Sequence, residues 1–270
     1  MKKAVVFLVL FFFFSCKKEK PEVVDSIVKV DTNQALYGNW VGDFVVVESD
    51  SLVEETGYMF TNKINLVIKK IENNKVYGQS IVAGNSRPLL GEITTVNGKP
   101  GFILKEPGDR KDDGRFEFTF FNDTIKGKWL ANDKKKYPVW ERGFVLTKQV
   151  FRYNPKLMLP EDGDYIDWFS GRTDSIAEPG EEALYSELYR SASDVITKLN
   201  ASTTILNESD LKNLKKLELE IIRNTIFARH GYTFKKKSFR QFFDPVDWYI
   251  PVTDDMSGKL TLIEQKILFY

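Results

Sequence analysis

The chain has one histidine and one cysteine, and these two side chains bound much of the chemistry that the sequence allows. His230 could act as a general base if a carboxylate such as Asp244 or Asp247 oriented its ring. Its place beside Arg229, in the last turn of a predicted helix, favours a structural role instead, because cations there interact with unpaired carbonyls. A buried Arg229–His230 pair bonded to Asp244 would then hold the following turn against Trp248.

Cys16 points to covalent lipid attachment. Lys2 and Lys3 precede an apolar run over residues 4–14, and Ser15 stands directly before the cysteine. The run is too short to cross a bilayer as a helix, which takes about 20 residues. The segment resembles a bacterial lipoprotein signal, which implies cleavage before Cys16, acylation of its thiol with palmitate-type chains and a place in the outer membrane. The mostly basic residues 17–20 favour the periplasmic face, and exposure at the cell surface stays open. An ordinary secretory peptide and an uncleaved anchor are the alternatives.

Composition excludes several classes of function. Without residues 1–15, the chain keeps 37 basic and 38 acidic side chains, and this balance argues against nucleic acid as a partner. One histidine without a free thiol makes a transition-metal site improbable, and the acidic run at 161–167 lacks the calcium-loop pattern. Nucleophile-elbow, P-loop and dinucleotide motifs are absent from the sequence, so we expect no cofactor, no metal and no catalytic residue. A glycosidase-type pair of carboxylates stays open.

Residues 37–152 carry hydrophobic side chains with a period of two. Ile64, Leu66 and Ile68, for example, alternate with polar residues, which is typical of half-buried strands. Turn residues separate these runs, with Asn97-Gly98 as the strongest signal. The pattern predicts eight antiparallel strands, near residues 40–47, 61–70, 75–83, 87–96, 100–105, 115–121, 124–131 and 141–148. Eight strands in tight hairpins favour an up-and-down β-barrel.

Gly38 and Trp40 stand at the head of the first predicted strand. A Gly-x-Trp motif there resembles the opening of lipocalin-like barrels, in which the tryptophan closes one end. The resemblance implies a barrel that could hold a small hydrophobic ligand. Arg142, near the start of the last strand, could stack on the Trp40 ring. The alternative is a barrel that its many phenylalanines fill completely.

The segment after the barrel differs from the barrel in amino-acid composition. Residues 153–180 are rich in proline, glycine and acidic side chains, which is typical of a linker. Apolar residues then recur at helical spacing, including Leu184, Leu188 and Ala192, and predict an amphipathic helix from about residue 181 to 199.

A longer helix is predicted from about residue 208 to 229, followed by Gly231 in the left-handed position that ends helices. A short helical stretch around Phe239 and a last helix near residues 260–268 complete the C-terminal region. From about residue 202 onward, this region resembles a YARHG domain. The matching residues are Arg223, Asn224, Phe227 to Tyr232, Phe234, Phe242, Phe243, Trp248 and Tyr249. Phe227 replaces the tyrosine of the name motif. The resemblance implies a role outside the cytoplasm, at the cell wall, and brings no established catalytic residues.

Together these observations predict a two-domain α+β protein: a signal peptide (1–15), a tether (16–36), a lipocalin-like β-barrel (37–152), a linker with a helix (153–200) and a YARHG-like helical domain (201–270). We expect a non-catalytic envelope lipoprotein that binds peptidoglycan or another envelope protein. The candidate contact residues are Arg223, Asn224, Phe227, Arg229, His230, Gly231, Trp248 and Tyr249. The alternatives are an enzyme that acts on a wall polymer with His230 and Asp244, and a barrel that binds a small hydrophobic ligand.

Overall fold

The computed structural model describes residues 33–55, 59–96, 98–121, 123–176 and 184–268. The described residues belong to one compact unit, residues 33–270. Cys16, the predicted signal and the predicted tether up to residue 32 lie outside the described residues. Within the described ranges, no helix has the length and apolar character that crossing a bilayer requires.

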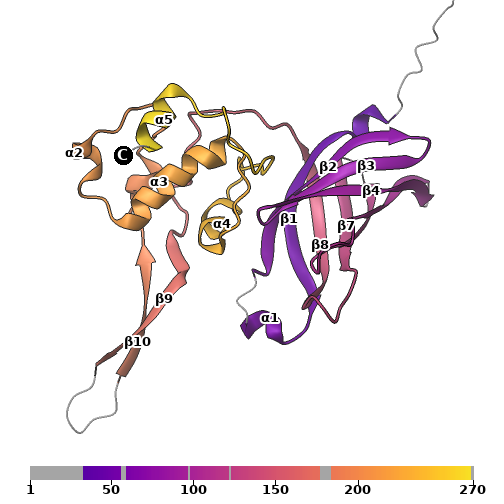
Figure 1. The fold of residues 1–270 in the computed structure, drawn as a ribbon, viewed down its shortest axis with the longest axis horizontal. Coiled ribbons are helices and arrows are strands. Elements are labelled where there is room, and N and C mark those ends of the chain that lie inside the picture. Colours follow the sequence, from indigo (N-terminus) through magenta and orange to yellow (C-terminus); the bar gives the residue numbers. More distant parts are fainter. Residues whose placement is uncertain (1–32, 56–58, 97, 122, 177–183, 269–270) are drawn as a thin grey trace, which may run out of the picture. The chain divides into compact units, whose positions relative to one another are not determined.

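Eight antiparallel strands close into a barrel, in the order in which they follow one another along the chain (Figure 1). The closing contact joins the first strand to the last, where Phe44 lies opposite Phe144. This topology confirms the predicted up-and-down barrel. The strands are β1 (Gly38–Ser49), β2 (Thr61–Glu72), β3 (Lys75–Val82), β4 (Asn85–Val96), β5 (Lys99–Lys105), β6 (Gly114–Phe121), β7 (Thr124–Ala131) and β8 (Val139–Gln149). Two short helices, η1 (Gln34–Leu36) and α1 (Leu52–Glu55), flank β1.

Local turn chemistry joins the strands. Asn73 and Asn74 form the two-residue link between β2 and β3, with φ angles of 50° and 66°. Positive φ at both positions is the requirement of a type I′ turn, which matches the twist of the strands it joins. Gly98 also has a positive φ, of 75°, whereas its predicted turn partner Asn97 lies outside the described residues.

Aromatic side chains occupy the interior of the barrel. The rings of Phe102 and Phe118 stack with centroids 4.8 Å apart, and Trp40 meets Phe120 edge-on at 4.9 Å. Phe116 is buried among the same rings. The indole of Trp40 donates a hydrogen bond to the carbonyl of Leu36 in η1 at 2.9 Å, so this tryptophan lies against the segment that precedes β1. The aromatic side chains therefore pack against one another inside the barrel.

The expected stacking of Arg142 on Trp40 is wrong. Arg142 lies 5.2 Å from the centroid of the Phe44 ring and donates to the Phe44 carbonyl at 2.8 Å. The register of β8 against β1 explains the difference, because Arg142 pairs with Val46, six residues beyond Trp40 and about 20 Å along the strand. Lys148 covers Trp40 instead, with its ammonium group 5.7 Å from the ring.

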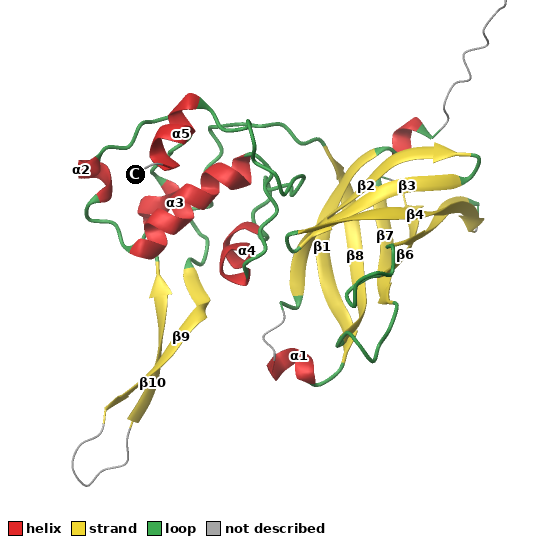
Figure 2. Cartoon of the chain, viewed as in Figure 1, coloured by secondary structure: helices red, strands yellow, loops and turns green. Residues whose placement is uncertain are grey.

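The predicted helix over residues 181–199 is also wrong. A two-stranded antiparallel hairpin, formed by β9 (Ile166–Ile176) and β10 (Leu184–Ser191), stands there, and β9 occupies part of the predicted linker (Figure 2). A separation of four residues, as between Leu184 and Leu188, places two side chains on one face of either a helix or a strand. Both leucines are exposed, so burial in a core does not favour a helix over a strand at these positions. A 3-10 helix, η2 (Asp194–Thr197), follows.

The C-terminal region contains α2 (Glu208–Leu211), α3 (Lys216–Arg229), α4 (Lys237–Phe243) and α5 (Leu262–Leu268). The single helix predicted over 208–229 is divided into α2 and α3. Asn207 caps α2 by accepting bonds from the amides of Ser209 and Asp210. At the start of α3, the carboxylate of Glu218 accepts a hydrogen bond from the Lys215 amide at 2.6 Å. This region has its own apolar core, formed by Leu217, Ile221, Ile222 and Ile226 of α3 with Phe234, Phe242, Phe243 and Tyr249.

Candidate functional site

The residues of the C-terminal motif separate into a buried and an accessible group. Arg229 is 2% exposed, whereas Arg223 is exposed and Phe227 is half-buried. Helical geometry accounts for the difference: Arg223 and Phe227 are four residues apart on one face of α3, while Arg229 follows Ile226 by three residues on the buried stripe. The same spacing in the sequence was a signal that Arg229 would be buried.

The buried group centres on His230. Its Nε2 lies 2.8 Å from Oε2 of Glu264 in α5, and the hydroxyl of Tyr153 donates to the other oxygen of Glu264 at 3.0 Å. The rings of Tyr153 and His230 stack with centroids 4.2 Å apart. The expected contact of His230 with Asp244 is therefore wrong, since Asp244 follows α4 and accepts a hydrogen bond from the amide of Lys63.

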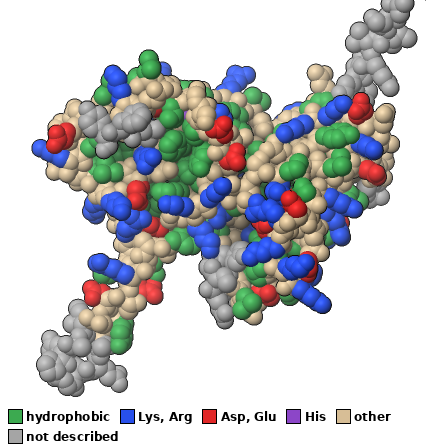
Figure 3. Space-filling view, viewed as in Figure 1, with side chains coloured by type: hydrophobic (Ala, Val, Ile, Leu, Met, Phe, Trp, Pro, Cys, Tyr) green, Lys and Arg blue, Asp and Glu red, His purple; other side chains and the backbone are tan. Residues whose placement is uncertain are grey.

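This His230 cluster (Tyr153, His230 and Glu264) is a packed polar network. Burial alone would raise the pKa of Glu264, but hydrogen bonds from His230, Ser202 and the Thr261 amide lower it to about 2. Burial, together with the charge of Glu264, raises the pKa of Tyr153 to about 12. His230 is 6% exposed, and no histidine is visible on the face of the molecule in Figure 3. The arrangement joins α3, α5 and the segment after the barrel, which is a structural role.

Arg229 and Trp248 hold that same segment. The Arg229 guanidinium donates to the carbonyl of Leu157 at 2.7 Å and to the hydroxyl of Ser202 at 3.0 Å. Burial lowers the pKa of Arg229 to about 10, although the charge of Glu264 acts in the opposite direction. The indole of Trp248 donates to the carbonyl of Met158 at 2.7 Å. Arg229 and Trp248 therefore use these hydrogen-bond donors in contacts within the fold.

Gly231 allows the turn that follows α3. Its φ of 72° lies in the left-handed region, and its amide donates to the carbonyl of Ala228 at 2.9 Å, as expected for a residue that ends a helix. A Cβ atom there would lie 2.5 Å from Val252 and 2.8 Å from Phe151. Close packing therefore adds to the backbone requirement for glycine.

Replacing Gly231 with alanine is expected to lower the free energy of unfolding by about 2 kcal/mol, through the left-handed backbone and the crowded Cβ. Urea denaturation followed by circular dichroism measures the change. Gly258 provides a matched control, because it has a φ of 68° but no heavy atom within 4 Å of its added Cβ. An equal loss in the two variants would show that packing around Gly231 contributes nothing.

The accessible group lines a groove of about 480 Å³, which we call the motif groove. Aromatic contacts run along it: Phe227 to Tyr232 at 5.9 Å, Tyr232 to Phe234 at 5.3 Å and Phe234 to Phe239 at 6.1 Å between centroids. The other lining residues are Glu220, Arg223, Asn224, Lys235, Lys236 and Met256. The groove therefore combines ring faces with cationic side chains.

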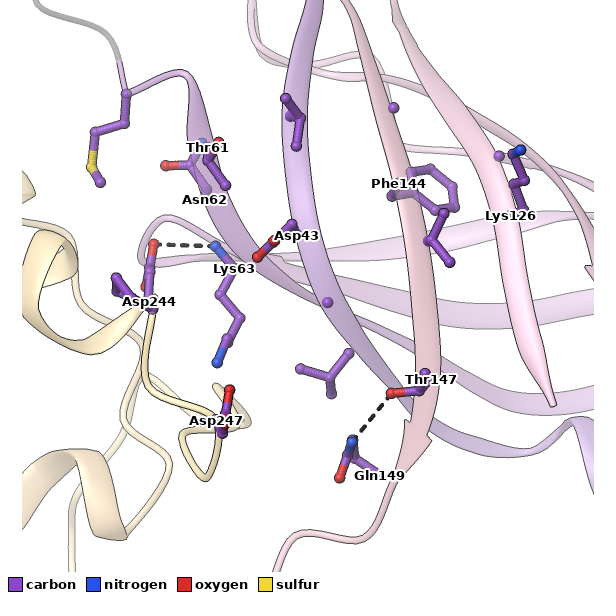
Figure 4. Close-up of a pocket in the computed structure, with 18 of the residues that line it drawn as sticks. Asp43, Thr61, Asn62, Lys63, Lys126, Phe144, Thr147, Gln149, Asp244 and Asp247 are labelled. Carbon is purple, nitrogen blue, oxygen red and sulfur yellow. Dashed lines mark hydrogen bonds between the residues drawn. The ribbon is translucent and has the colours of Figure 1, made fainter. Parts of the chain in front are cut away.

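A second groove, of about 980 Å³, lies between the outer wall of β1 and β8 and the end of α4 (Figure 4). We call it the junction groove. Lys63 of β2 lies beside it, with its amide bonded to Asp244 at 3.2 Å and its ammonium group bonded to the carbonyl of Val246. The labelled side chains of Asp43 and Asp247 flank Lys63 from the barrel and from the C-terminal region (Figure 4).

Sequence reasoning did not identify several residues of these sites. Glu264 lies 34 positions from His230 and carries no local signal for its role. Lys235 and Lys236 directly follow the motif, so their place in the motif groove could have been predicted from the sequence. Among the described residues, no group of three or more His, Cys, Asp or Glu side chains is arranged to hold a metal ion.

Comparison with known proteins bears on the C-terminal region. No curated protein matches the chain, and no solved structure matches it. Residues 193–270 match the family model of the YARHG domain, which begins slightly before the expected boundary near residue 202. The helical region that carries the His230 cluster and the motif groove is therefore a YARHG domain.

Proposed function

We propose that this chain is a non-catalytic envelope lipoprotein whose YARHG domain binds the cell wall or another envelope protein. The observation that carries the proposal is the motif groove, because the accessible motif residues Arg223, Asn224 and Phe227 line one surface. Accessible aromatic and arginine side chains are typical of binding sites. The buried motif residues support this surface from within.

Attachment through Cys16 belongs to the same proposal. The sequence around Cys16 supports a lipid anchor, and an anchored protein with a binding domain at its other end suits a role in linking the membrane to the wall. The outer membrane, on its periplasmic side, is the expected location.

The alternatives have weaker support. An enzyme that uses His230 with Asp244 would need these side chains together, whereas His230 contacts Glu264 and Asp244 contacts Lys63. Binding of a small hydrophobic ligand would need space inside the barrel, where the Phe102 and Phe118 rings are stacked.

Binding to purified peptidoglycan sacculi tests the proposal. The chain from residue 17 onward is expected to sediment with sacculi, and charge reversal at two exposed groove cations, Arg223→Glu with Lys236→Glu, is expected to reduce the bound fraction at least tenfold. The matched control is Lys212→Glu with Lys216→Glu, two exposed lysines outside the groove. Crosslinking in intact cells covers the envelope-protein branch of the proposal. Absence of both sacculus binding and a groove-dependent crosslink would refute the proposed function.

A further inference from the structure

The motif groove carries positive charges that no described carboxylate nearby neutralises. Arg223, Lys235 and Lys236 line it, and no described carboxylate lies within ion-pair distance of any of the three. The acid in the lining, Glu220, is paired with Arg190 at 3.0 Å. The groove thus presents an uncompensated cationic surface, which favours an anionic ligand.

Two of these cations stand over aromatic rings. The Arg223 guanidinium lies 5.8 Å from the centroid of Phe227, and the Lys236 ammonium group lies 5.8 Å from that of Phe239. Such contacts place the charged groups beside apolar ring surface. A ligand that fits must therefore carry an anionic group next to an apolar part. The volume of about 480 Å³ suits a small ligand or a few residues of a chain.

We propose that the motif groove binds the carboxylate-bearing stem peptide of cell-wall fragments, with Arg223 pairing with a carboxylate and Phe227 and Tyr232 contacting the apolar part beside it. The proposal rests on the proposed wall-binding function and names the part of the polymer that is recognised. Arginine suits this role because its planar guanidinium can hold a carboxylate through two parallel hydrogen bonds.

Charge distinguishes the peptide from the rest of the wall polymer. Where stem peptides are attached, the sugar rings of the glycan carry no free acid. The peptides themselves carry free carboxylates. Three unpaired cations in one groove would gain little from a neutral glycan. The charge complementarity of the groove therefore favours the peptide over the glycan.

Calorimetric titration tests the inference with three soluble probes: a disaccharide tetrapeptide, the same molecule with its carboxyl groups amidated, and the disaccharide with its lactyl carboxyl group amidated. The chain from residue 17 onward is expected to bind the first probe in a salt-sensitive way and the other two at least tenfold more weakly. Arg223→Gln is expected to weaken binding of the first probe at least tenfold. Arg223→Lys should recover part of it, because the charge returns without the planar fork.

Lys212→Gln is the matched control, since Lys212 is exposed and lies outside the groove. Circular dichroism and the melting temperature establish that each variant is folded. Equal binding of the amidated tetrapeptide probe or of the amidated disaccharide, or unchanged binding by Arg223→Gln, would overturn the inference. If sacculi still bind in that case, the proposed function stands and the recognised group is another one. Failure to bind any probe overturns the inference as well.

Discussion

Replacing Glu264 with alanine is expected to lower the free energy of unfolding by about 3–5 kcal/mol, because several buried hydrogen-bonding groups would lose their shared partner. Glu264 is fully buried and accepts hydrogen bonds from the Tyr153 hydroxyl and the Thr261 amide, besides its contact with His230. Alanine would leave these groups buried without their acceptor and remove the hydrogen-bonded contact between α5 and the end of α3.

Urea denaturation measures the loss, and hydrogen exchange of the α3 amides locates it. Glu264→Gln is expected to cost less, because the amide oxygen can still accept a hydrogen bond. The exposed Glu161→Ala provides the surface control. A loss below about 1 kcal/mol for Glu264→Ala, similar to that of the control, would contradict a structural role for the His230 cluster.

The low pKa of Glu264 adds a pH signature to the same prediction. Its folded-state pKa of about 2 lies below its ordinary value of 4.5, so its ionised form stabilises the fold above pH 4.5. This contribution is lost as the pH falls from 4.5 through 2. The loss of stability over that range should be smaller in Glu264→Gln, and an unchanged acid transition would show that Glu264 does not contribute to it.

Raising the pH from about 4 to 7 is expected to lower the free energy of unfolding, because Asp244, at the contact between the YARHG domain and the barrel, loses its proton. Burial raises the pKa of Asp244 to about 6, even though the Lys63 amide and the charges of Arg240 and Lys63 favour its ionised form; nearby Asp43 raises it further. Between the ordinary value of 3.8 and 6, the folded state holds a proton that the unfolded state releases. The stabilisation is therefore complete below pH 3.8 and lost as the pH rises through 6, by roughly 3 kcal/mol.

Urea unfolding of the natural chain and of Asp244→Asn across this pH range measures the effect. The asparagine variant should show a flatter dependence, because the group that titrates is gone. Hydrogen exchange at the Lys63 amide, which donates to Asp244, provides a local measurement at the junction. Asp247→Asn, an exposed neighbour in the same loop, is the control. Parallel pH profiles for the natural chain and Asp244→Asn would contradict the prediction.

The barrel was predictable because its signals are local. The strand predicted at 61–70 corresponds to β2 (Thr61–Glu72), and the one predicted at 124–131 to β7 (Thr124–Ala131). Alternation of apolar and polar residues fixes which side chains face the core, and short turns fix the pairing of neighbouring strands. Both kinds of information lie within a few residues.

The hairpin of β9 and β10 and the partner of His230 were not predictable in the same way. Leu184 and Leu188 suit a helix and a strand equally, and their exposure removes the burial that would distinguish the two. The pairing of His230 with Glu264 joins α3 to α5 across 34 positions, and Asp244, a closer carboxylate in the sequence, is held by the barrel instead. Among many acidic residues, only the path of the chain selects the partner.

The outer face of β2 shows most clearly what cannot be predicted from the sequence. The alternation of residues in β2 determines that Lys63 and Asn65 point away from the barrel interior, where Ile64 lies, and such polar side chains are expected in solvent. Both are buried, because the YARHG domain covers this face: the Asn65 amide donates to the carbonyl of Pro251 at 2.9 Å. The period of a strand, which is local, determines the direction of each side chain. What covers that side chain depends on contacts across nearly 190 positions, which only the tertiary structure decides.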